Sequence, residues 1–298
     1  TTEYPWNGNV KIDIDPRGSR QFALKLRVPG WVKDEVVPSD LYRYADQKKL
    51  TYTVKVNGSP VESSLEKGYF TIDRKWKKGD QVEVHFDMEA RVVKAHPKVD
   101  ADRGRVSVER GPIVYCAEWP DNKFSVLSAF MNRKPEFKVV NQPELLYGIN
   151  QLKTNAQTLA YDEKGRLYVN DVELTMIPYY AWAHRGSGEM AVWLPMDLSA
   201  SRPAMPPTVT TNAKITASHT VVSVSTINDG LVPEDESDRS VPYYHLWPKE
   251  GTTEWLAYEF EKVEEVSYTS VFWYDDGPWG GCRVPDSWNI YYKDDNGN

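Results

Sequence analysis

Hydrophobic and polar residues alternate along much of the first 90 positions. Val10, Ile12 and Ile14 alternate with charged side chains, and Phe22 to Val28 repeat the pattern. Because successive side chains of a strand point to opposite faces of a sheet, this period of two predicts strands with one buried face. Turn dipeptides such as Asn57-Gly58 separate the runs and favour hairpins. The pattern predicts an antiparallel sandwich or jelly roll.

One stretch of this region breaks the alternation. Residues 38–49, with the sequence PSDLYRYADQKK, are expected to form a short helical turn inserted between strands. Ser39 precedes the turn and is a suitable N-cap, because its hydroxyl can accept a hydrogen bond from a free backbone N–H.

The alternating pattern continues after residue 90 in two further units. Strand-like runs extend to about residue 195 and are followed by a stretch rich in Pro, Ser and Thr, typical of a linker. We therefore predict an all-β chain with domains at 1–92, 93–208 and 209–298. The third unit has about 85 residues after the linker, fewer than the ~100 of a complete sandwich.

The two ends of the sequence also indicate that the third unit is incomplete. The chain does not begin with Met, and it ends with Asn296-Gly297, a dipeptide typical of a hairpin turn, with no strand after it. We expect the third unit to be truncated and the chain to be a piece of a longer protein.

Composition and charge exclude several classes of protein. The net charge is −7, whereas a nucleic-acid-binding domain needs a basic face. No apolar run reaches the ~20 residues that span a bilayer. Cys116 and Cys282 are too few for a disulfide framework or a four-cysteine zinc site, and we expect two free thiols. The apolar neighbours of Cys116 predict a raised thiol pKa.

The titratable residues give no pattern of an active site. The five histidines do not cluster at metal-ligand spacing, so we expect them to be structural. Glycoside hydrolysis needs two carboxylates roughly 5 to 10 Å apart across a cleft. Nothing in the sequence places Glu109, Glu118 and Glu189 in that way, and there is no nucleophile elbow or phosphate-binding loop.

Several motifs nevertheless resemble a known family. The segments LRVPGW, VKVNGSPV, GYFTIDRKWKKGDQVEVHFDM and YYAWAHRGSGEMAVWLP are similar to the region after the catalytic barrel in bacterial beta-L-arabinofuranosidases, glycoside hydrolase family 127. The resemblance covers residues 4–197 and implies two jelly rolls behind an upstream (α/α) helical barrel. It also implies that the cysteine nucleophile and the zinc site lie in that barrel, so no catalytic residue is expected here.

The third unit resembles a discoidin-like, coagulation-factor type C module, an incomplete galactose-binding-like jelly roll. The similar segments are ITASHT, TINDG, EWLAYEF and RVPDSWNIYYKD. Such modules often bind sugars through loops at one end of the sandwich, and sugars need an aromatic face with a few polar partners. The candidate carbohydrate-binding residues are Tyr243, Trp247, Trp273, Tyr274, Asp275, Asp276, Trp279 and Arg283.

Structural roles compete with these binding roles. The alternation around residues 270–276 requires at least one aromatic pair to be buried, and the following loop can be an ordinary turn. Asp229 lies where the similar modules often hold a structural calcium ion, but an Asn-Asp-Gly sequence is also typical of a plain turn. No other cofactor is expected.

The sequence therefore predicts the non-catalytic C-terminal β portion of a glycoside hydrolase. In this interpretation two sandwiches support the barrel through an exposed apolar face, and the third is a candidate carbohydrate-binding module. The resemblance implies an arabinose-containing plant glycan and a periplasmic or secreted bacterial protein. A stand-alone lectin or adhesin, and an enzyme with its site within these residues, are the alternatives.

Overall fold

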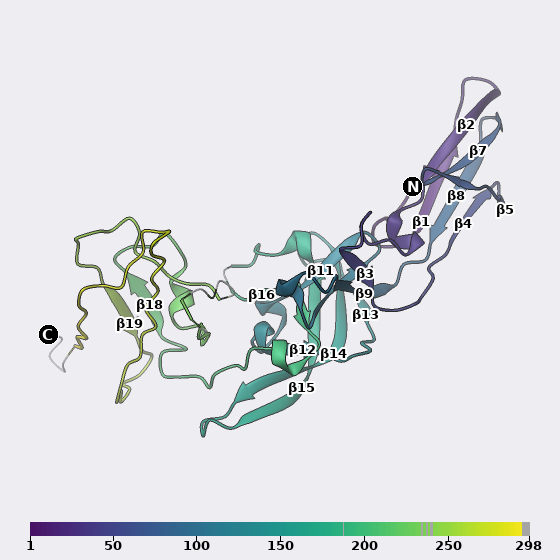
Figure 1. Ribbon diagram of the computed structural model, residues 1–298. Helices are drawn as coiled ribbons and strands as arrows, with labels where there is room; N and C mark the ends of the chain where they lie inside the picture. The colour runs from purple at the N-terminus through teal and green to yellow at the C-terminus, as the bar shows by residue number, and fades with distance from the viewer. Residues whose placement is uncertain (187, 234, 237, 239–240, 294–298) are drawn as a thin grey trace. The chain divides into compact units, whose positions relative to one another are not determined.

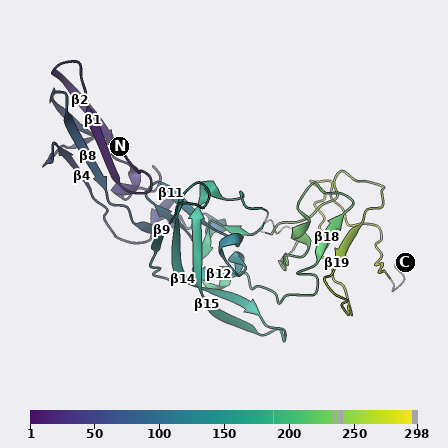
Figure 2. The same cartoon turned by 180° about the vertical axis from the view of Figure 1, so that it is seen from behind.

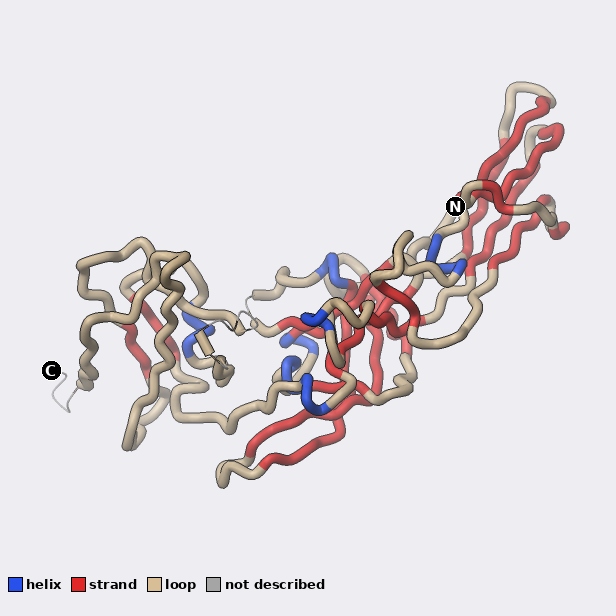
Figure 3. The backbone as a smooth tube through the Cα atoms, in the orientation of Figure 1, coloured by secondary structure: helices blue, strands red, loops and turns tan. Residues whose placement is uncertain are grey.

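The chain is all-β, as the alternating pattern predicted (Figure 1). The computed structural model describes residues 1–298 except 187, 234, 237, 239–240 and 294–298, so the turn predicted at Asn296-Gly297 lies outside the described residues. Helical segments of the described chain are short 3-10 turns of three or four residues (Figure 3). The chain forms two compact units, residues 1–203 and 204–298.

The first sandwich consists of two antiparallel sheets. One has the order β1 (Asn9–Ile14), β8 (Asp80–Phe86), β4 (Tyr52–Val56), β5 (Ser59–Pro60), and the other β2 (Arg20–Arg27), β7 (Tyr69–Trp76), β6 (Leu65–Glu66). The inward residues of both sheets form one core that includes Ile14, Val54, Phe70, Trp76, Val82, Val84 and Phe86. Phe22, which the alternation placed inward, is 38% exposed and stacks on the buried Trp76 at a ring separation of 5.9 Å.

The helical turn predicted at residues 38–49 is wrong. Tyr42–Tyr44 form strand β3, which pairs with β9 (Ala90–Ala95) in the register Tyr44 opposite Val93. A weak capping signal cannot compete with a full set of backbone hydrogen bonds to a neighbouring strand. Strand β3 therefore joins the first sandwich to the large sheet of the second.

The second sandwich is built on a ten-stranded sheet (Figure 2). Its main order is β12 (Ala129–Met131), β14 (Ile149–Tyr161), β15 (Leu167–Pro178), β11 (Ile113–Glu118), β10 (Arg105–Arg110), β9 and β3. Strand β13 (Lys138–Gln142) also pairs with β14, while β16 (Met190–Ala191) and β17 (Leu194–Pro195) pair with β11 and β10. Its main core includes Val106, Val108, Tyr115, Ala117, Met131, Leu152, Leu174, Met176 and Leu194.

A second, smaller apolar cluster belongs to the same sandwich. It consists of Cys116, Ile149, Ile177 and Ala181, with Trp6 and Met190 packed against it. Since Cys116 lies between the core residues Tyr115 and Ala117 on β11, its side chain points to the opposite face of the sheet.

The second unit contains little regular structure among its described residues. Strand β18 (Lys214–Ala217) pairs with β19 (Leu256–Glu259), and Val241 is its one buried hydrophobic side chain within the described part. Residues 270–276 and 287–292 alternate as strands do but form no strand. Strands persist only where neighbours satisfy their backbone groups, and the alternation in these segments fixes no neighbour.

Candidate functional site

The structure brings two of the predicted sugar-binding residues into direct contact. The rings of Tyr243 and Tyr274 stack with their centres 4.7 Å apart and their planes at 25°. Tyr243 is 43% exposed and Tyr274 is half-buried. The pair is thus an aromatic surface that remains accessible to a ligand.

Trp247 lies close to the loop that follows Tyr274. A Cβ added at Gly281 would lie 2.2 Å from a carbon of the Trp247 ring, so the ring rests on the glycine backbone. The Trp247 carbonyl lies 2.9 Å from Nε2 of His219, which fixes its segment to another part of the unit. Gly281 is therefore required by the close packing of the Trp247 ring.

The charged residues of the loop form one cluster. Arg283 Nη1 donates a hydrogen bond to Asp276 Oδ1 at 3.2 Å and lies 3.5 Å from Asp275 Oδ1. Asp276 Oδ1 also accepts from the Cys282 backbone N–H at 2.8 Å, and Asp275 Oδ1 accepts from that of Gly277 at 2.7 Å. The three side chains thus hold the turn together while remaining partly exposed.

The remaining two predicted aromatic residues lie elsewhere in the loop region. Trp273 packs edge-on against Trp288, with ring centres 6.1 Å apart. Trp279 is 95% exposed, and its backbone N–H donates to the Asp276 carbonyl at 3.0 Å. The prediction that one aromatic pair of residues 270–276 is buried is wrong, since Val271 and Phe272 are 41% and 47% exposed and Trp273 is only half-buried. These residues form no strand, so alternation does not assign them a buried face. Trp279 stands at the exposed tip of the turn.

Asp229 takes part in a local turn. Its Oδ1 accepts a hydrogen bond from the backbone N–H of Leu231 at 2.9 Å. Among the described residues, no three His, Cys, Asp or Glu side chains are grouped so that they could hold a metal ion. The calcium site at Asp229 stays a prediction.

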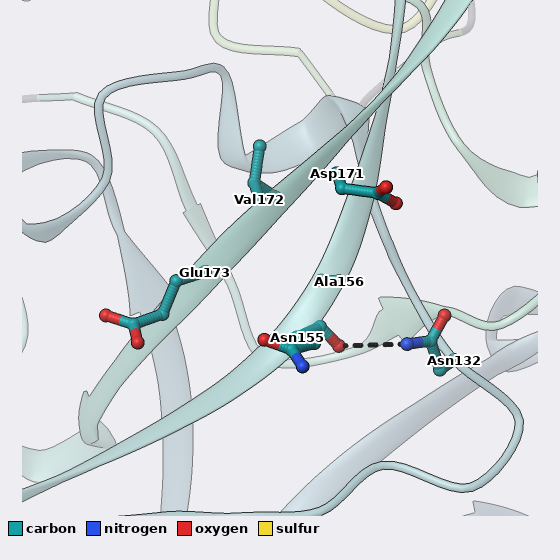
Figure 4. A pocket seen from close by; sticks show the side chains of 6 residues that line it. All are labelled: Asn132, Asn155, Ala156, Asp171, Val172 and Glu173. Atoms are coloured by element: carbon teal, nitrogen blue, oxygen red, sulfur yellow. Dashed lines mark hydrogen bonds between the residues drawn. The ribbon is translucent and has the colours of Figure 1, made fainter.

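A polar groove in the second sandwich was not expected from the sequence. It has a volume of about 510 Å³ and is lined by Asn132, Asn155, Ala156, Asp171, Val172 and Glu173 (Figure 4). Its two carboxylates are already paired, since Asp171 accepts from Gln157 at 2.9 Å and Glu173 from Lys153 at 2.5 Å. These are cross-strand pairs of the β14–β15 hairpin. The two carboxylates that line the groove therefore have a structural role.

A buried ionic cluster was also missed by sequence reasoning. Arg185 binds both Glu118 and Asp121, with Nη1 to Asp121 Oδ1 at 2.8 Å, and Glu118 is only 2% exposed. The cluster raises the pKa of Arg185 through hydrogen bonds from the guanidinium to the two carboxylates. Both carboxylates bind the same guanidinium nitrogen, Arg185 Nη2, so they are paired within the fold.

The other two candidate carboxylates have separate structural roles. Glu109 accepts from the Tyr44 hydroxyl at 3.0 Å, and Glu189 accepts from the Ser125 hydroxyl at 2.9 Å. Burial raises the pKa of both carboxyl groups. Each of these glutamates thus has a hydrogen-bond partner within the fold.

The cysteines agree with the expectation of free thiols. Cys116 is fully buried and unpaired with Cys282, which is half-buried. Burial raises the pKa of the Cys116 thiol to about 12, and the nearby carboxylates of Glu118 and Asp121 act in the same direction. Its thiol is therefore protonated near neutral pH and is a poor nucleophile.

Within the described residues, no helix has the length and apolarity needed to cross a membrane.

Two domain families match the chain in sequence. Residues 1–88 match the middle domain of beta-L-arabinofuranosidases of glycoside hydrolase family 127, and residues 90–195 match the C-terminal domain of the same family. The non-reducing end beta-L-arabinofuranosidase of Bifidobacterium longum is 31% identical over 211 residues, which are 64% of this chain and 29% of that protein.

Solved structures show the same similarity. A GH127 beta-arabinofuranosidase is 61% identical with a TM-score of 0.67, over 69% of this chain and 32% of that one. A GH127 beta-L-arabinofuranosidase from Geobacillus stearothermophilus is 34% identical with a TM-score of 0.56, over 65% of this chain and 29% of that one. The chain thus spans about a third of the length of these relatives.

Proposed function

Residues 1–195 of this chain carry the middle and C-terminal domains of glycoside hydrolase family 127, and on this premise we propose that the chain is the non-catalytic β portion of a beta-L-arabinofuranosidase. The observation that carries the proposal is the match of two consecutive family domains, in a chain about a third as long as its relatives. The structural roles of Glu109, Glu118 and Glu189 support the absence of catalysis.

The partner in this proposal is an upstream (α/α) helical barrel that carries the active site. The two sandwiches support the barrel and hold it against an arabinose-containing glycan. Large apolar side chains on the surface of residues 1–203, among them the fully exposed Tyr147 and the half-exposed Leu167, are candidates for the supporting face. Burying such side chains against a second domain is favourable by the hydrophobic effect.

The proposal gives the second unit a separate role in binding carbohydrate. Tyr243 and Tyr274 offer stacked rings to the apolar face of a sugar, and Trp247 lies on the adjacent loop. Asp275, Asp276 and Arg283 offer charged groups that can bind sugar hydroxyls. A binding unit tethered to an enzyme raises the effective concentration of the enzyme on a polymer.

Two measurements on the 298-residue chain test the proposal. The chain should not release 4-nitrophenol from 4-nitrophenyl β-L-arabinofuranoside above the buffer rate. Hydrolysis that disappears in a Glu118→Gln variant would overturn the non-catalytic assignment. Calorimetry should show binding of short arabinofuranosyl oligosaccharides that weakens in the Tyr243→Ala/Tyr274→Ala variant and persists in Tyr147→Ala, the matched surface control. Equal sugar binding by the wild type, the Tyr243→Ala/Tyr274→Ala variant and Tyr147→Ala would contradict a sugar site in the second unit.

A further inference from the structure

The hairpin turn between β4 and β5 contains an Asn-Gly dipeptide. Val56 pairs with Ser59 across the hairpin. Asn57 and Gly58 are therefore a two-residue turn, and their φ angles are 51° and 79°. Positive φ at both positions is typical of a type I′ turn. Asn57 is exposed, and a Cβ added at Gly58 would meet no atom within 4 Å, so the turn is open to solvent.

The side-chain amide of Asn57 is bound on both sides. Its Nδ2 donates to Asp80 Oδ1 at 2.9 Å, and its Oδ1 accepts from the backbone N–H of Gln81 at 2.8 Å. Because a carboxylate only accepts hydrogen bonds and a backbone N–H only donates, these two partners fix the orientation of the amide. The Asn57 side chain thus ties the β4–β5 turn to the start of β8.

Asp80 is the buried partner in this contact. The residue is only 2% exposed, and its Oδ2 accepts from the backbone N–H of Lys77 at 2.9 Å. The hydrogen bond from Asn57 is the largest cause that lowers the pKa of the Asp80 carboxyl below its usual range. Asp80 is therefore ionised near neutral pH, and a buried carboxylate needs the donor that Asn57 supplies.

An Asn-Gly dipeptide also has a chemistry of its own. Asparagine is among the thermolabile residues, and a following glycine has no side chain to shield its backbone nitrogen. The nitrogen of Gly58 attacks Cγ of Asn57, a cyclic imide forms, and the amide nitrogen leaves as ammonia. Water then opens the imide to aspartate or isoaspartate. In sum, an amide and a water molecule give a carboxylate and an ammonium ion.

The fold opposes the first step of this reaction. Ring closure needs a rotation about the Cα–C bond of Asn57 that takes the backbone out of the type I′ conformation. It also requires the amide to leave Asp80 and Gln81. The backbone N–H of Asn57 donates to the Gln81 carbonyl at 2.9 Å and holds the turn in place. The reaction therefore needs local opening of the turn.

The product of the reaction does not restore the contact with Asp80. A carboxylate at position 57 still accepts from the Gln81 N–H, but it has no donor for Asp80 and places a second negative charge beside it. We propose that Asn57 is a deamidation site that the fold suppresses, so that the modification accumulates when the turn opens and then prevents the contact with Asp80 from re-forming.

One other Asn-Gly dipeptide lies in the described part of the chain and has a different environment. Gly8 is buried, and a Cβ added there would lie 1.8 Å from the Phe86 carbonyl oxygen. The Gly8 carbonyl accepts from the Phe86 N–H at 3.0 Å. Asn7-Gly8 therefore opens only when this segment leaves β8. Deamidation at Asn7 is an internal measure of that larger unfolding.

Mass spectrometry of peptides from the full chain tests the suppression. Deamidation at Asn57 should be at least about tenfold slower in the native chain than in guanidinium chloride, because only the opened turn reacts. Asp80→Ala removes the acceptor of the amide and should speed the native reaction at Asn57 without speeding it at Asn7. Equal rates at Asn57 in the native and unfolded chain, or no change in Asp80→Ala, would overturn the proposal.

Urea unfolding of the full chain tests the consequence of the modification. Asn57→Asp mimics the aspartate product and should unfold at a lower urea concentration than the wild type. Asn57→Asp/Asp80→Asn exchanges donor and acceptor and should recover part of the loss. Asn170→Asp adds the same charge at an exposed position of β15 and should leave the midpoint nearly unchanged. A midpoint for Asn57→Asp equal to that of the wild type would show that the contact with Asp80 does not matter and would contradict the inference.

Discussion

The guanidinium carbon of Arg91 lies 3.6 Å from the centre of the Tyr44 ring. Arg91 belongs to β9 and is 2% exposed, and its Nη2 binds Asp34 at 2.7 Å and Asp46 at 2.5 Å. Tyr44 belongs to β3, and its hydroxyl donates to Glu109 on β10. One arginine therefore connects the first sandwich to the large sheet of the second, where the strand pairing between them is only three residues long.

Replacing this arginine should weaken the connection. Arg91→Met keeps the stem but removes the cation from Tyr44 and from two aspartates, and we expect a loss of about 2 to 3 kcal/mol in the free energy of unfolding. Asp34 can be rehydrated, because its side chain is 55% exposed, so the loss should not be larger. Urea unfolding followed by circular dichroism measures it. Arg103→Met, at a site 76% exposed, should change stability by less than about 0.5 kcal/mol, and an equal loss there would contradict the expectation.

Glu109 should make stability depend on pH in the direction opposite to most carboxylates. Burial raises the pKa of Glu109 above 4.5, so the folded state holds the proton more tightly than the unfolded chain. This contribution to stability is complete below the unfolded pKa and is lost as pH rises through the folded pKa. Glu109→Gln cannot lose a proton, and its stability relative to the wild type should therefore increase from pH 4 to pH 7.

Asp87 provides the control of opposite sign. Hydrogen bonds from Thr51 lower the pKa of the Asp87 carboxyl below 3.8. This stabilisation is present above the unfolded pKa and is lost as pH falls, so Asp87→Asn should become less stable relative to the wild type as pH rises. Urea titrations of Glu109→Gln from pH 4 to pH 7 and of Asp87→Asn from about pH 2 to pH 5, where each pKa shift acts, measure the two slopes. Slopes of the same sign would contradict the opposite pKa shifts of Glu109 and Asp87.

The ionic cluster of Arg185, Glu118 and Asp121 should be sensitive to loss of its cation. Arg185→Met leaves the buried Glu118 and Asp121 without a positive partner, and we expect a loss of about 3 to 5 kcal/mol. Adding Glu118→Gln removes one of the uncompensated charges and should recover part of the loss. Arg166→Met removes an ion pair at a site 73% exposed and should cost at most about 1 kcal/mol. Tryptophan fluorescence during urea unfolding follows all three variants, and an unchanged midpoint for Arg185→Met would contradict the role of the cluster.

The two thiols should differ in reactivity. The buried Cys116 has a thiol pKa of about 12, so it should not react with Ellman's reagent in the native chain at pH 8. The half-buried Cys282 should react slowly, and both thiols should react in guanidinium chloride. Cys282→Ser should abolish the native reaction. A native Cys282→Ser chain that still reacts at the rate of unfolded protein would show that Cys116 is accessible.

Local patterns in the sequence predicted the strands of the two sandwiches well. Val82, Val84 and Phe86 alternate on β8 and are buried together, because the period of a strand is a property of a few consecutive residues. The same reasoning failed at Tyr42–Tyr44, since a strand can be stabilised by a partner some 50 residues away. Alternation is also present at residues 287–292, but the described chain forms no strand there.

The candidate sites, too, could be predicted only in part from the sequence. The sequence by itself determined the residue types of the candidate sugar site, namely aromatic rings beside carboxylates and an arginine in the loop of residues 273–283. Tertiary structure alone decided that Tyr243 meets Tyr274, that Arg185 meets Glu118 and Asp121, and that Ala181 points inward while its aromatic neighbours point out. The physical reason is that alternation assigns a residue to a face of its own strand, whereas the residue opposite that face depends on strand pairing and loop closure over long sequence separations.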